Sequence, residues 1–163
     1  MKTHRVTQQT ERRRRQPRIL AIASGGGHWI QLMRLRPAFA GARISYASVN
    51  LDSAKDVEGN RYFTFPDANR ERKFALLCQV LKIAWIIFRV RPNFVVSTGA
   101  SCGYLAIRMG RMLGARSLFL DSIANAEKMS LSAQLALRHA NMTLTQWPHL
   151  SCPEGPQYRG SVI

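Results

Sequence analysis

Residues 19–28 decide the fold of this chain, and they read Ile-Leu-Ala-Ile-Ala-Ser-Gly-Gly-Gly-His. The unbroken apolar run at its start is typical of a strand buried on both faces. Three glycines and His28 follow, and then apolar residues at helical spacing. A strand that enters a helix through glycines brings the backbone close to a ligand and exposes free N–H groups. The stretch predicts a loop for a phosphate-type anion, formed by Ser24, Gly25, Gly26 and Gly27; the alternative is a tight turn with a solvent-facing His28.

Known nucleotide motifs do not describe this loop. It lacks the G-x-G-x-x-G spacing and the acidic ribose ligand of an NAD site, and it lacks the G-x-x-x-x-G-K-[ST] pattern of a P-loop. The loop therefore predicts a domain with a nucleotide-binding type of fold but with neither an NAD site nor a P-loop.

Strand-like and helix-like segments alternate along the rest of the chain, which predicts an α/β fold: a Rossmann-like parallel sheet with helices on both faces. Residues 1–17 are expected to form a basic flexible arm, and residues 18–163 a single domain. Strands are expected at residues 18–23, 43–49, 62–65, 93–97, 116–120 and 142–145, and helices at 29–36, 71–90, 103–113 and 129–139.

The composition indicates a folded protein with an anionic partner. Hydrophobic residues make up 46% of the 163 residues, which excludes a disordered chain. The net charge of +15 fits nucleic acid, anionic lipid or a phosphorylated substrate. The three cysteines show no disulfide framework or metal-binding spacing, and no Cys/His cluster predicts a metal site.

Residues 74–88 are apolar almost all round, with only Gln79 and Lys82 strongly polar. As a helix they would be about 22 Å long, too short for the ~30 Å hydrocarbon core of a bilayer. Such a helix is either deeply buried or in contact with lipid, and basic residues flank it on both sides. We expect contact with an anionic membrane surface through Trp85, Ile86, Ile87 and Phe88, and packing on the sheet is the alternative.

Two further loops follow buried strands. Residues 97–103 contain Thr98, Gly99 and Ser101, which are candidate ligands of an oxyanion; a purely conformational role of the glycines is the alternative. Asp121 begins the third loop and is a candidate to orient His28, to bind sugar hydroxyls or to act as a base, unless it serves as a turn or N-cap residue.

Together these loops resemble a known family, the acceptor-side subunits of two-component sugar-nucleotide glycosyltransferases. Members include bacterial PssD-type exopolysaccharide proteins and the membrane-anchoring half of the eukaryotic dolichol-linked GlcNAc transferase. The amino-terminal half of the glycosyltransferase that makes lipid II has a similar layout. The resemblance covers roughly residues 18–163, and it is carried by Ser24–His28, Ser97–Ala100, Asp121-Ser122, Ser130–Ser132, Gln146-Trp147 and Tyr158–Ile163. The chain departs from the family pattern at Asp121, Asn125 and Trp29, where Glu, Arg and a smaller residue are usual.

The resemblance implies the amino-terminal half of a GT-B enzyme divided between two chains. This chain would hold a polyprenyl-diphosphate-linked acceptor at the cytoplasmic face of the inner membrane, as a peripheral or monotopic protein. A partner subunit would bind the UDP-sugar donor, and no cofactor or metal would be needed. His28 and Asp121 are the candidate catalytic residues, and Ser122 and Asn125 join the first two loops in binding the acceptor diphosphate.

Two other function classes remain open from the sequence. One is a non-catalytic membrane anchor that recruits and activates the catalytic partner. The other is a nucleic-acid-binding protein, which the charge and the run Arg12–Arg15 would favour. No nucleic-acid-binding fold signature accompanies that charge, so no specific nucleic acid is expected as a partner.

Overall fold

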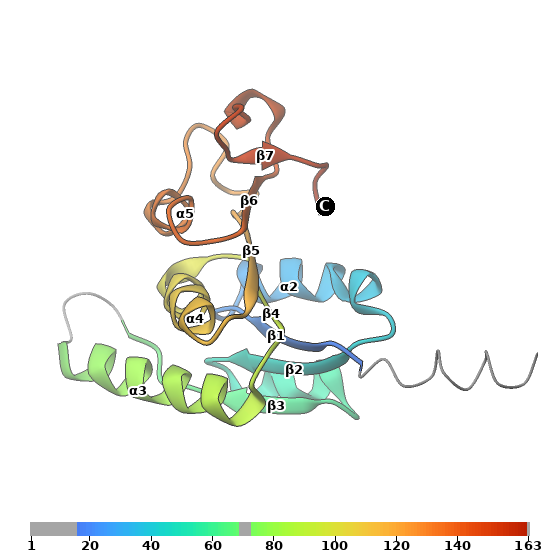
Figure 1. Cartoon of the computed structure of the whole chain (residues 1–163), viewed down its shortest axis with the longest axis vertical. Coiled ribbons are helices and arrows are strands. Elements are labelled where there is room, and N and C mark those ends of the chain that lie inside the picture. Colours follow the sequence, from blue (N-terminus) through green and yellow to red (C-terminus); the bar gives the residue numbers. More distant parts are fainter. Residues whose placement is uncertain (1–15, 69–72, 163) are drawn as a thin grey trace, which may run out of the picture.

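The computed structural model describes residues 16–68 and 73–162 of the chain. Within them, seven parallel strands form one sheet in the order β3-β2-β1-β4-β5-β6-β7 (Figure 1). The strands are β1 (Arg18–Ile22), β2 (Arg43–Ser48), β3 (Arg61–Thr64), β4 (Phe94–Ser97), β5 (Arg116–Leu120), β6 (Met142–Thr145) and β7 (Gln157–Tyr158). Apart from residues 16 and 17, the predicted basic arm lies outside the described residues.

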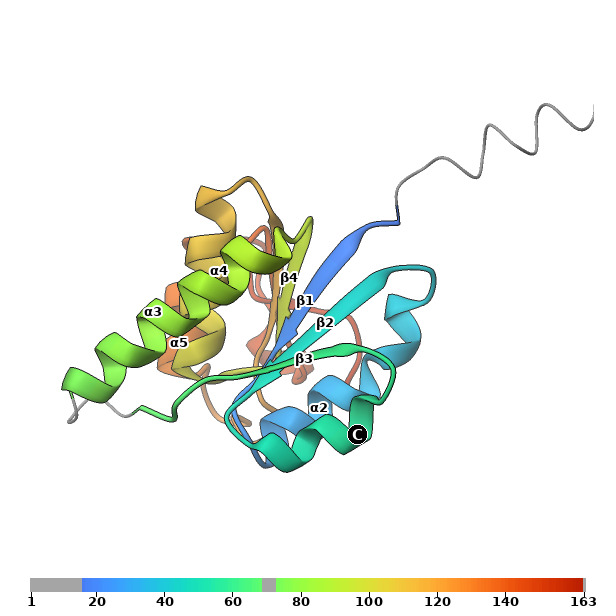
Figure 2. The same cartoon turned by 90° about the horizontal axis from the view of Figure 1, so that it is seen from below.

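Helices cover both faces of this sheet. They are α2 (Gly27–Arg34), α3 (Lys73–Val90), α4 (Ala100–Met112) and α5 (Leu131–Ala136), with 3-10 helices η1 (Arg36–Phe39), η2 (Leu51–Val57) and η3 (Pro148–Leu150). Helices α3, α4 and α5 lie on one face, and α2 lies on the other (Figure 2). The predicted fold class is therefore confirmed.

Strand β1 shows why its sequence is an unbroken apolar run. Leu20 and Ile22 belong to the core under α3 and α4, whereas Ile19 and Ala21 belong to the core under α2. Successive side chains of a strand point to opposite faces, so a strand covered on both sides needs apolar residues throughout. Trp29 belongs to the second core, where its ring packs edge-on against Tyr46 and its Nε1 donates to Asp56 Oδ2 at 2.7 Å.

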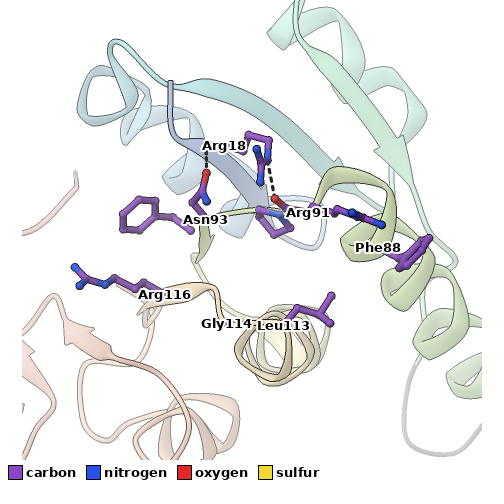
Figure 3. Close-up of a pocket in the computed structure, with 9 residues that line it drawn as sticks. Arg18, Phe88, Arg91, Asn93, Leu113, Gly114 and Arg116 are labelled. Atoms are coloured by element: carbon purple, nitrogen blue, oxygen red, sulfur yellow. Dashed lines mark hydrogen bonds between the residues drawn. The ribbon is translucent and has the colours of Figure 1, made fainter. Parts of the chain in front are cut away.

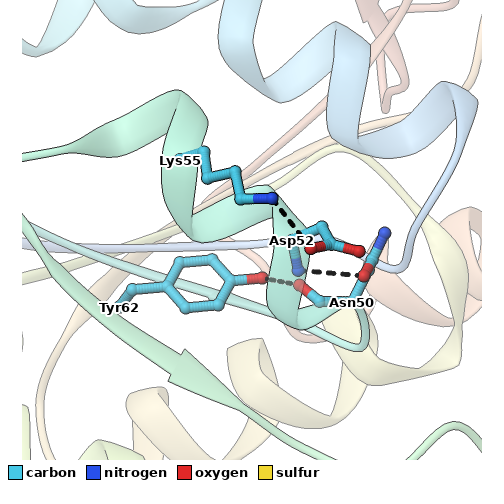
Figure 4. Close-up of polar contacts among 4 residues, drawn as sticks. All are labelled: Asn50, Asp52, Lys55 and Tyr62. Carbon is cyan, nitrogen blue, oxygen red and sulfur yellow. Dashed lines mark hydrogen bonds and ion pairs between the residues drawn. The ribbon is translucent and has the colours of Figure 1, made fainter.

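The sequence predicted each of the six long strands and the four α-helices, but neither η2 nor β7. Segment η2 has no apolar periodicity; Val57 anchors it in the core, and polar contacts join its first residues. Asn50 caps it by accepting the N–H of Asp52 at 3.0 Å, the Tyr62 hydroxyl donates to the Asn50 carbonyl, and Lys55 pairs with Asp52 (Figure 4). Strand β7 has two residues, too few to leave a pattern.

Helix α3 is divided between core and solvent. Ile86 and Ile87 are 0% and 1% exposed and lie in the core, so the prediction that they contact lipid is wrong. Trp85 and Phe88 face outward, and Phe88 is 63% exposed. Large exposed apolar residues recur along the helix at the spacing of one face, and we call this set the α3 stripe: Phe74, Leu77, Leu81, Trp85 and Phe88. Within the described residues, no helix combines the length and apolarity needed to cross a bilayer.

Candidate functional site

The first two glycine loops meet where the strand order of the sheet reverses. The chain proceeds from β1 outward to β2 and β3, and then returns to place β4 on the other side of β1. The carboxyl ends of β1 and β4 are direct neighbours, with Ile22 opposite Ser97. Doubly wound sheets bind their ligands in the crevice at this point. The topology thus brings together the two loops that the sequence predicted to share a site.

His28 and Thr98 join the two loops by reciprocal hydrogen bonds. His28 Nδ1 lies 2.8 Å from the Thr98 carbonyl oxygen, and Thr98 Oγ1 donates to the His28 carbonyl at 2.6 Å. Because a carbonyl only accepts, Nδ1 carries the proton, which leaves Nε2 as the unprotonated nitrogen of the neutral ring. The His28 side chain is partly exposed at this edge of the sheet. The Thr98 hydroxyl, in contrast, is buried and committed to this contact.

Gly99 provides the room for the His28 ring. A Cβ atom at residue 99 would overlap His28 Nδ1 and Cε1, and the φ angle of 135° lies in a region that favours glycine. The next residue, Ala100, also has a positive φ, of 62°. The second glycine turn therefore has a conformational role, as the alternative interpretation held, and that role serves to position His28.

The helices that leave these two loops begin without side-chain caps. Gly26 precedes α2 and Gly99 precedes α4, and neither helix start has a side-chain hydrogen bond. Elsewhere Ser130 caps α5 and Asn50 caps η2 through their side chains. Uncapped helix starts present N–H groups and positive dipole ends. Two such starts at one edge of the sheet form a favourable environment for an anion.

The predicted ligands of the first two loops differ in their accessibility. Gly26 and Gly27 are exposed, and Ser24 and Gly25 are half-buried. Ser101 is exposed on the first turn of α4 and lines a cavity of about 400 Å³ with Tyr104, Leu105 and Leu135. The backbone of Gly25–Gly27 and the hydroxyls of Ser24 and Ser101 are thus available to a ligand.

Asp121 holds the third loop together. Its carboxylate is buried, at 1% exposure, and accepts the N–H of Ser122 at 3.0 Å, the N–H of Ser130 at 2.8 Å and the Asn125 amide at 2.9 Å. These bonds correspond to the turn role that the sequence left open for Asp121. The Asn125 side chain, expected to reach a phosphate, donates within the loop instead.

A buried pair of glutamines joins the third loop to α2. Gln146 Nε2 donates to Gln31 Oε1 at 2.6 Å and to the Asp121 carbonyl at 2.9 Å, and Gln31 Nε2 donates to Ser122 Oγ at 3.2 Å. Ser122, a predicted acceptor ligand, is therefore buried in this network. Sequence reasoning missed Gln31, whose only signal was a polar residue on the inner side of a helix, and gave Gln146 no role.

Metal-ligating side chains do not cluster in the described part of the chain: residues 16–68 and 73–162 contain no group of three or more His, Cys, Asp or Glu close enough to hold an ion.

Comparison with known proteins adds evidence from structure alone. No family model matches the sequence, and no curated protein sequence matches it. MurG from Acinetobacter baumannii has a similar structure, with a TM-score of 0.69 and 14% identity over 89% of this chain and 45% of MurG. A UDP-N-acetylglucosamine 2-epimerase from Rickettsia bellii follows at 0.66 and 12%, over 91% of this chain and 46% of the epimerase. A glycosyltransferase from Rickettsia africae gives 0.57 and 16%, over 80% and 37%.

The chain spans less than half the length of each of these proteins. At such identities the likeness concerns the fold, and it agrees with the strand order and the helices on both faces. The chain therefore has a Rossmann-like α/β fold similar to one part of each of these proteins.

Proposed function

We propose that this chain is the acceptor-binding, membrane-associating subunit of a split glycosyltransferase. The complex would move a sugar from a UDP-sugar to a polyprenyl-diphosphate-linked acceptor during exopolysaccharide or oligosaccharide assembly. The observation that carries the proposal is the pairing of His28 with Thr98 beside two uncapped helix starts. The structural likeness to MurG and to a glycosyltransferase supports the reaction class.

The acceptor diphosphate is assigned to the first glycine loop. Backbone N–H groups of Gly25–Gly27 and the dipoles of α2 and α4 stabilise negative charge there. Ser24 and Ser101 have accessible hydroxyls that add hydrogen bonds. The cavity beside Ser101, with Leu76, Leu105 and Leu135 in its lining, offers an apolar surface to the first isoprene units of the acceptor.

His28 is the proposed general base. An acceptor hydroxyl attacks the anomeric carbon of the donor, the new C–O bond forms as the bond to the UDP oxygen breaks, and the hydroxyl proton passes to His28 Nε2. Inversion at the anomeric carbon follows from a single displacement. The bond from Nδ1 to the Thr98 carbonyl orients the ring and stabilises the positive charge that it gains.

The α3 stripe is the proposed membrane contact, and we propose that it binds the surface of an anionic bilayer. Lys73, Lys82 and Arg89 lie on the same helix, and the chain carries a net charge of +15. Apolar residues with cationic neighbours are typical of helices that lie in the plane of the membrane interface. We propose a peripheral position on the cytoplasmic face of the inner membrane, next to the lipid-linked acceptor.

The partner is proposed to be a UDP-sugar-binding subunit that contributes the other half of the cleft. To test this, the full chain is purified alone and also co-expressed with the candidate partner, and sugar transfer to a polyprenyl-diphosphate acceptor is measured. We expect transfer only from the complex. Turnover by the lone chain, free of partner, contradicts the split arrangement.

A second function, a non-catalytic anchor that activates its partner, is favoured by one observation. The polar side chains of the third loop form hydrogen bonds within the loop and to α2. His28 is then the one residue of this chain proposed to take part in the reaction. Full turnover of a complex that carries His28→Ala would favour the anchor. Loss of turnover with an intact complex would favour the catalytic half.

A further inference from the structure

Arginine residues gather at the edge of the sheet opposite the glycine loops. Strands β1, β2, β3 and β5 each begin with an arginine, and the parallel sheet places all these strand starts at one edge. The carboxyl end of α3 adds two more arginines at the same edge. We call this set the amino-edge arginines: Arg18, Arg43, Arg61, Arg89, Arg91 and Arg116.

These side chains line two adjoining cavities. One, of about 420 Å³, is lined by Arg18, Arg43, Arg61, Arg89 and Arg91 together with Ser45 and Val90. The other, of about 600 Å³, shares Arg18 and Arg91 and adds Arg116 and the apolar residues Phe88, Phe94 and Leu113 (Figure 3). One end of the combined site is thus cationic, and the other is lined by apolar as well as cationic side chains.

Within residues 16–68 and 73–162, no carboxylate forms an ion pair with these arginines and none lines the two cavities; the one ion pair there joins Lys55 to Asp52. Arg18 is held in place, because its Nε donates to the Arg91 carbonyl at 2.7 Å and its backbone N–H donates to Asn93 Oδ1 at 2.9 Å. Like charges so held repel one another, and an anion between them relieves that repulsion.

Arg91 occupies a position that suits glycine. It follows the last residue of α3 and has a φ of 47°, in the left-handed region where helices commonly end with glycine. Its guanidinium lies 5.2 Å from the centroid of the Phe88 ring. A charged side chain in an unfavourable backbone conformation, at the junction of two cavities, is the kind of local strain found at binding sites.

We infer that the amino-edge arginines bind the phosphate group of an anionic amphiphile, whose apolar part lies against Phe88, Phe94 and Leu113. Guanidinium groups bind phosphate oxygens through paired, charge-assisted hydrogen bonds. The phosphate belongs either to a phospholipid headgroup or to a soluble phosphorylated compound. The α3 stripe ends at Phe88, inside this site, which favours the headgroup. The lipid source rests on the proposed membrane association, whereas phosphate binding does not.

The first test measures pyrophosphate binding to the full chain by calorimetry and by NMR shift mapping. A double variant, Arg43→Gln with Arg61→Gln, removes two charges from the site. Arg108→Gln with Arg138→Gln removes two exposed charges elsewhere and serves as the control. We expect affinity at the amino edge to fall about tenfold in the first variant, since each lost charge-assisted contact weakens binding, and to stay within about twofold in the control. Equal affinities in the two variants overturn the proposal.

A second variant separates binding from folding. Arg91→Gly relieves the positive φ, so we expect its Tm to rise by about 2 °C while pyrophosphate binding weakens. Unchanged binding in this variant contradicts a site centred on Arg91.

Vesicles then identify the source of the phosphate. The full chain and both double variants are mixed with phosphatidylcholine vesicles, with and without phosphatidylglycerol. If the preference for phosphatidylglycerol is lost only in the Arg43/Arg61 variant, the ligand is a headgroup. If pyrophosphate binding is lost there but the lipid preference remains, the ligand is a soluble phosphate. Failure of every form to bind vesicles refutes the membrane contact of the α3 stripe and leaves the pyrophosphate result to decide this site. Binding of duplex DNA is measured on the same variants. If DNA binding depends on Arg43 and Arg61 while neither pyrophosphate nor vesicles bind, the proposal is overturned.

Discussion

The imidazole of His28 occupies the space in which a side chain at residue 99 would lie. The positions of two residues from separate loops therefore depend on each other, where the strand order of the sheet reverses. This relationship explains the glycine at position 99 and gives the first prediction.

Gly99→Ala will displace the His28 ring and destabilise the fold. The φ of 135° disfavours alanine, and its methyl group overlaps the ring. We expect a loss of about 2–3 kcal/mol in the free energy of unfolding, measured by urea denaturation. Gly41→Ala is the matched control, because Gly41 has a φ of 80° but open space around it. It should cost about 1 kcal/mol; equal losses in the two variants would mean that the contact with His28 has no energetic weight.

His28→Ala will reduce turnover of the assembled complex by about 10²–10⁴-fold, the usual effect of removing a general base. Binding of the partner should change little. Thr98→Val provides the control, since it removes the hydroxyl but keeps the carbonyl that accepts from His28 Nδ1. Its cost should be about 1 kcal/mol of stability with turnover largely retained. A comparable loss of turnover in both variants would point to loop architecture rather than proton transfer.

Asp121→Asn will destabilise the third loop. The substitution places an amide where the carboxylate accepts two backbone N–H groups and the Asn125 side chain. One buried donor then faces another, which costs about 1–3 kcal/mol. Thermal and urea unfolding measure this loss. Unchanged stability together with abolished turnover would instead assign Asp121 to the reaction.

Replacing exposed apolar residues of α3 with serine will release the protein from anionic vesicles without unfolding it. Phe74, Leu77 and Leu81 are exposed, so changing all three to serine removes apolar contact area and leaves the core intact. Vesicle flotation measures the release, and circular dichroism checks the fold. Ile86→Ala is the contrasting variant, expected to lose about 2–5 kcal/mol of stability. If the serine variant still binds vesicles as the parent does, the α3 stripe is not the membrane contact.

Thiol labelling will distinguish the buried cysteine from the exposed one. Burial raises the pKa of the Cys102 thiol from its ordinary 9.0 to about 12, whereas Cys152 lies at the surface. At pH 8 a thiol reagent should modify Cys152 rapidly and Cys102 only on unfolding, because the thiolate is the reactive form. The raised pKa also means that the contribution of Cys102 to stability is complete below pH 9 and declines as the pH rises from 9 toward 12. A fast-reacting Cys102 in the folded protein would contradict its position in the core.

The sequence by itself determined the fold class and the edge of the sheet at which the glycine loops lie. An apolar run such as residues 19–23 is readable because local periodicity and turn residues depend only on near neighbours in the chain. The alternation of such runs with helical patterns predicts the parallel sheet, and a parallel sheet places every loop after a strand at one edge.

Tertiary structure alone decided what individual side chains do. Helix α3 is apolar on nearly every side, so only its packing on the sheet shows that Ile86 is core and Phe88 is surface. Asp121 has its role from donors along its loop, and Gln31 from a partner more than a hundred residues away. The amino-edge arginines are scattered along the chain and meet because parallel strands start at a common edge. Contacts between distant residues depend on how complete elements pack, and no local pattern records them.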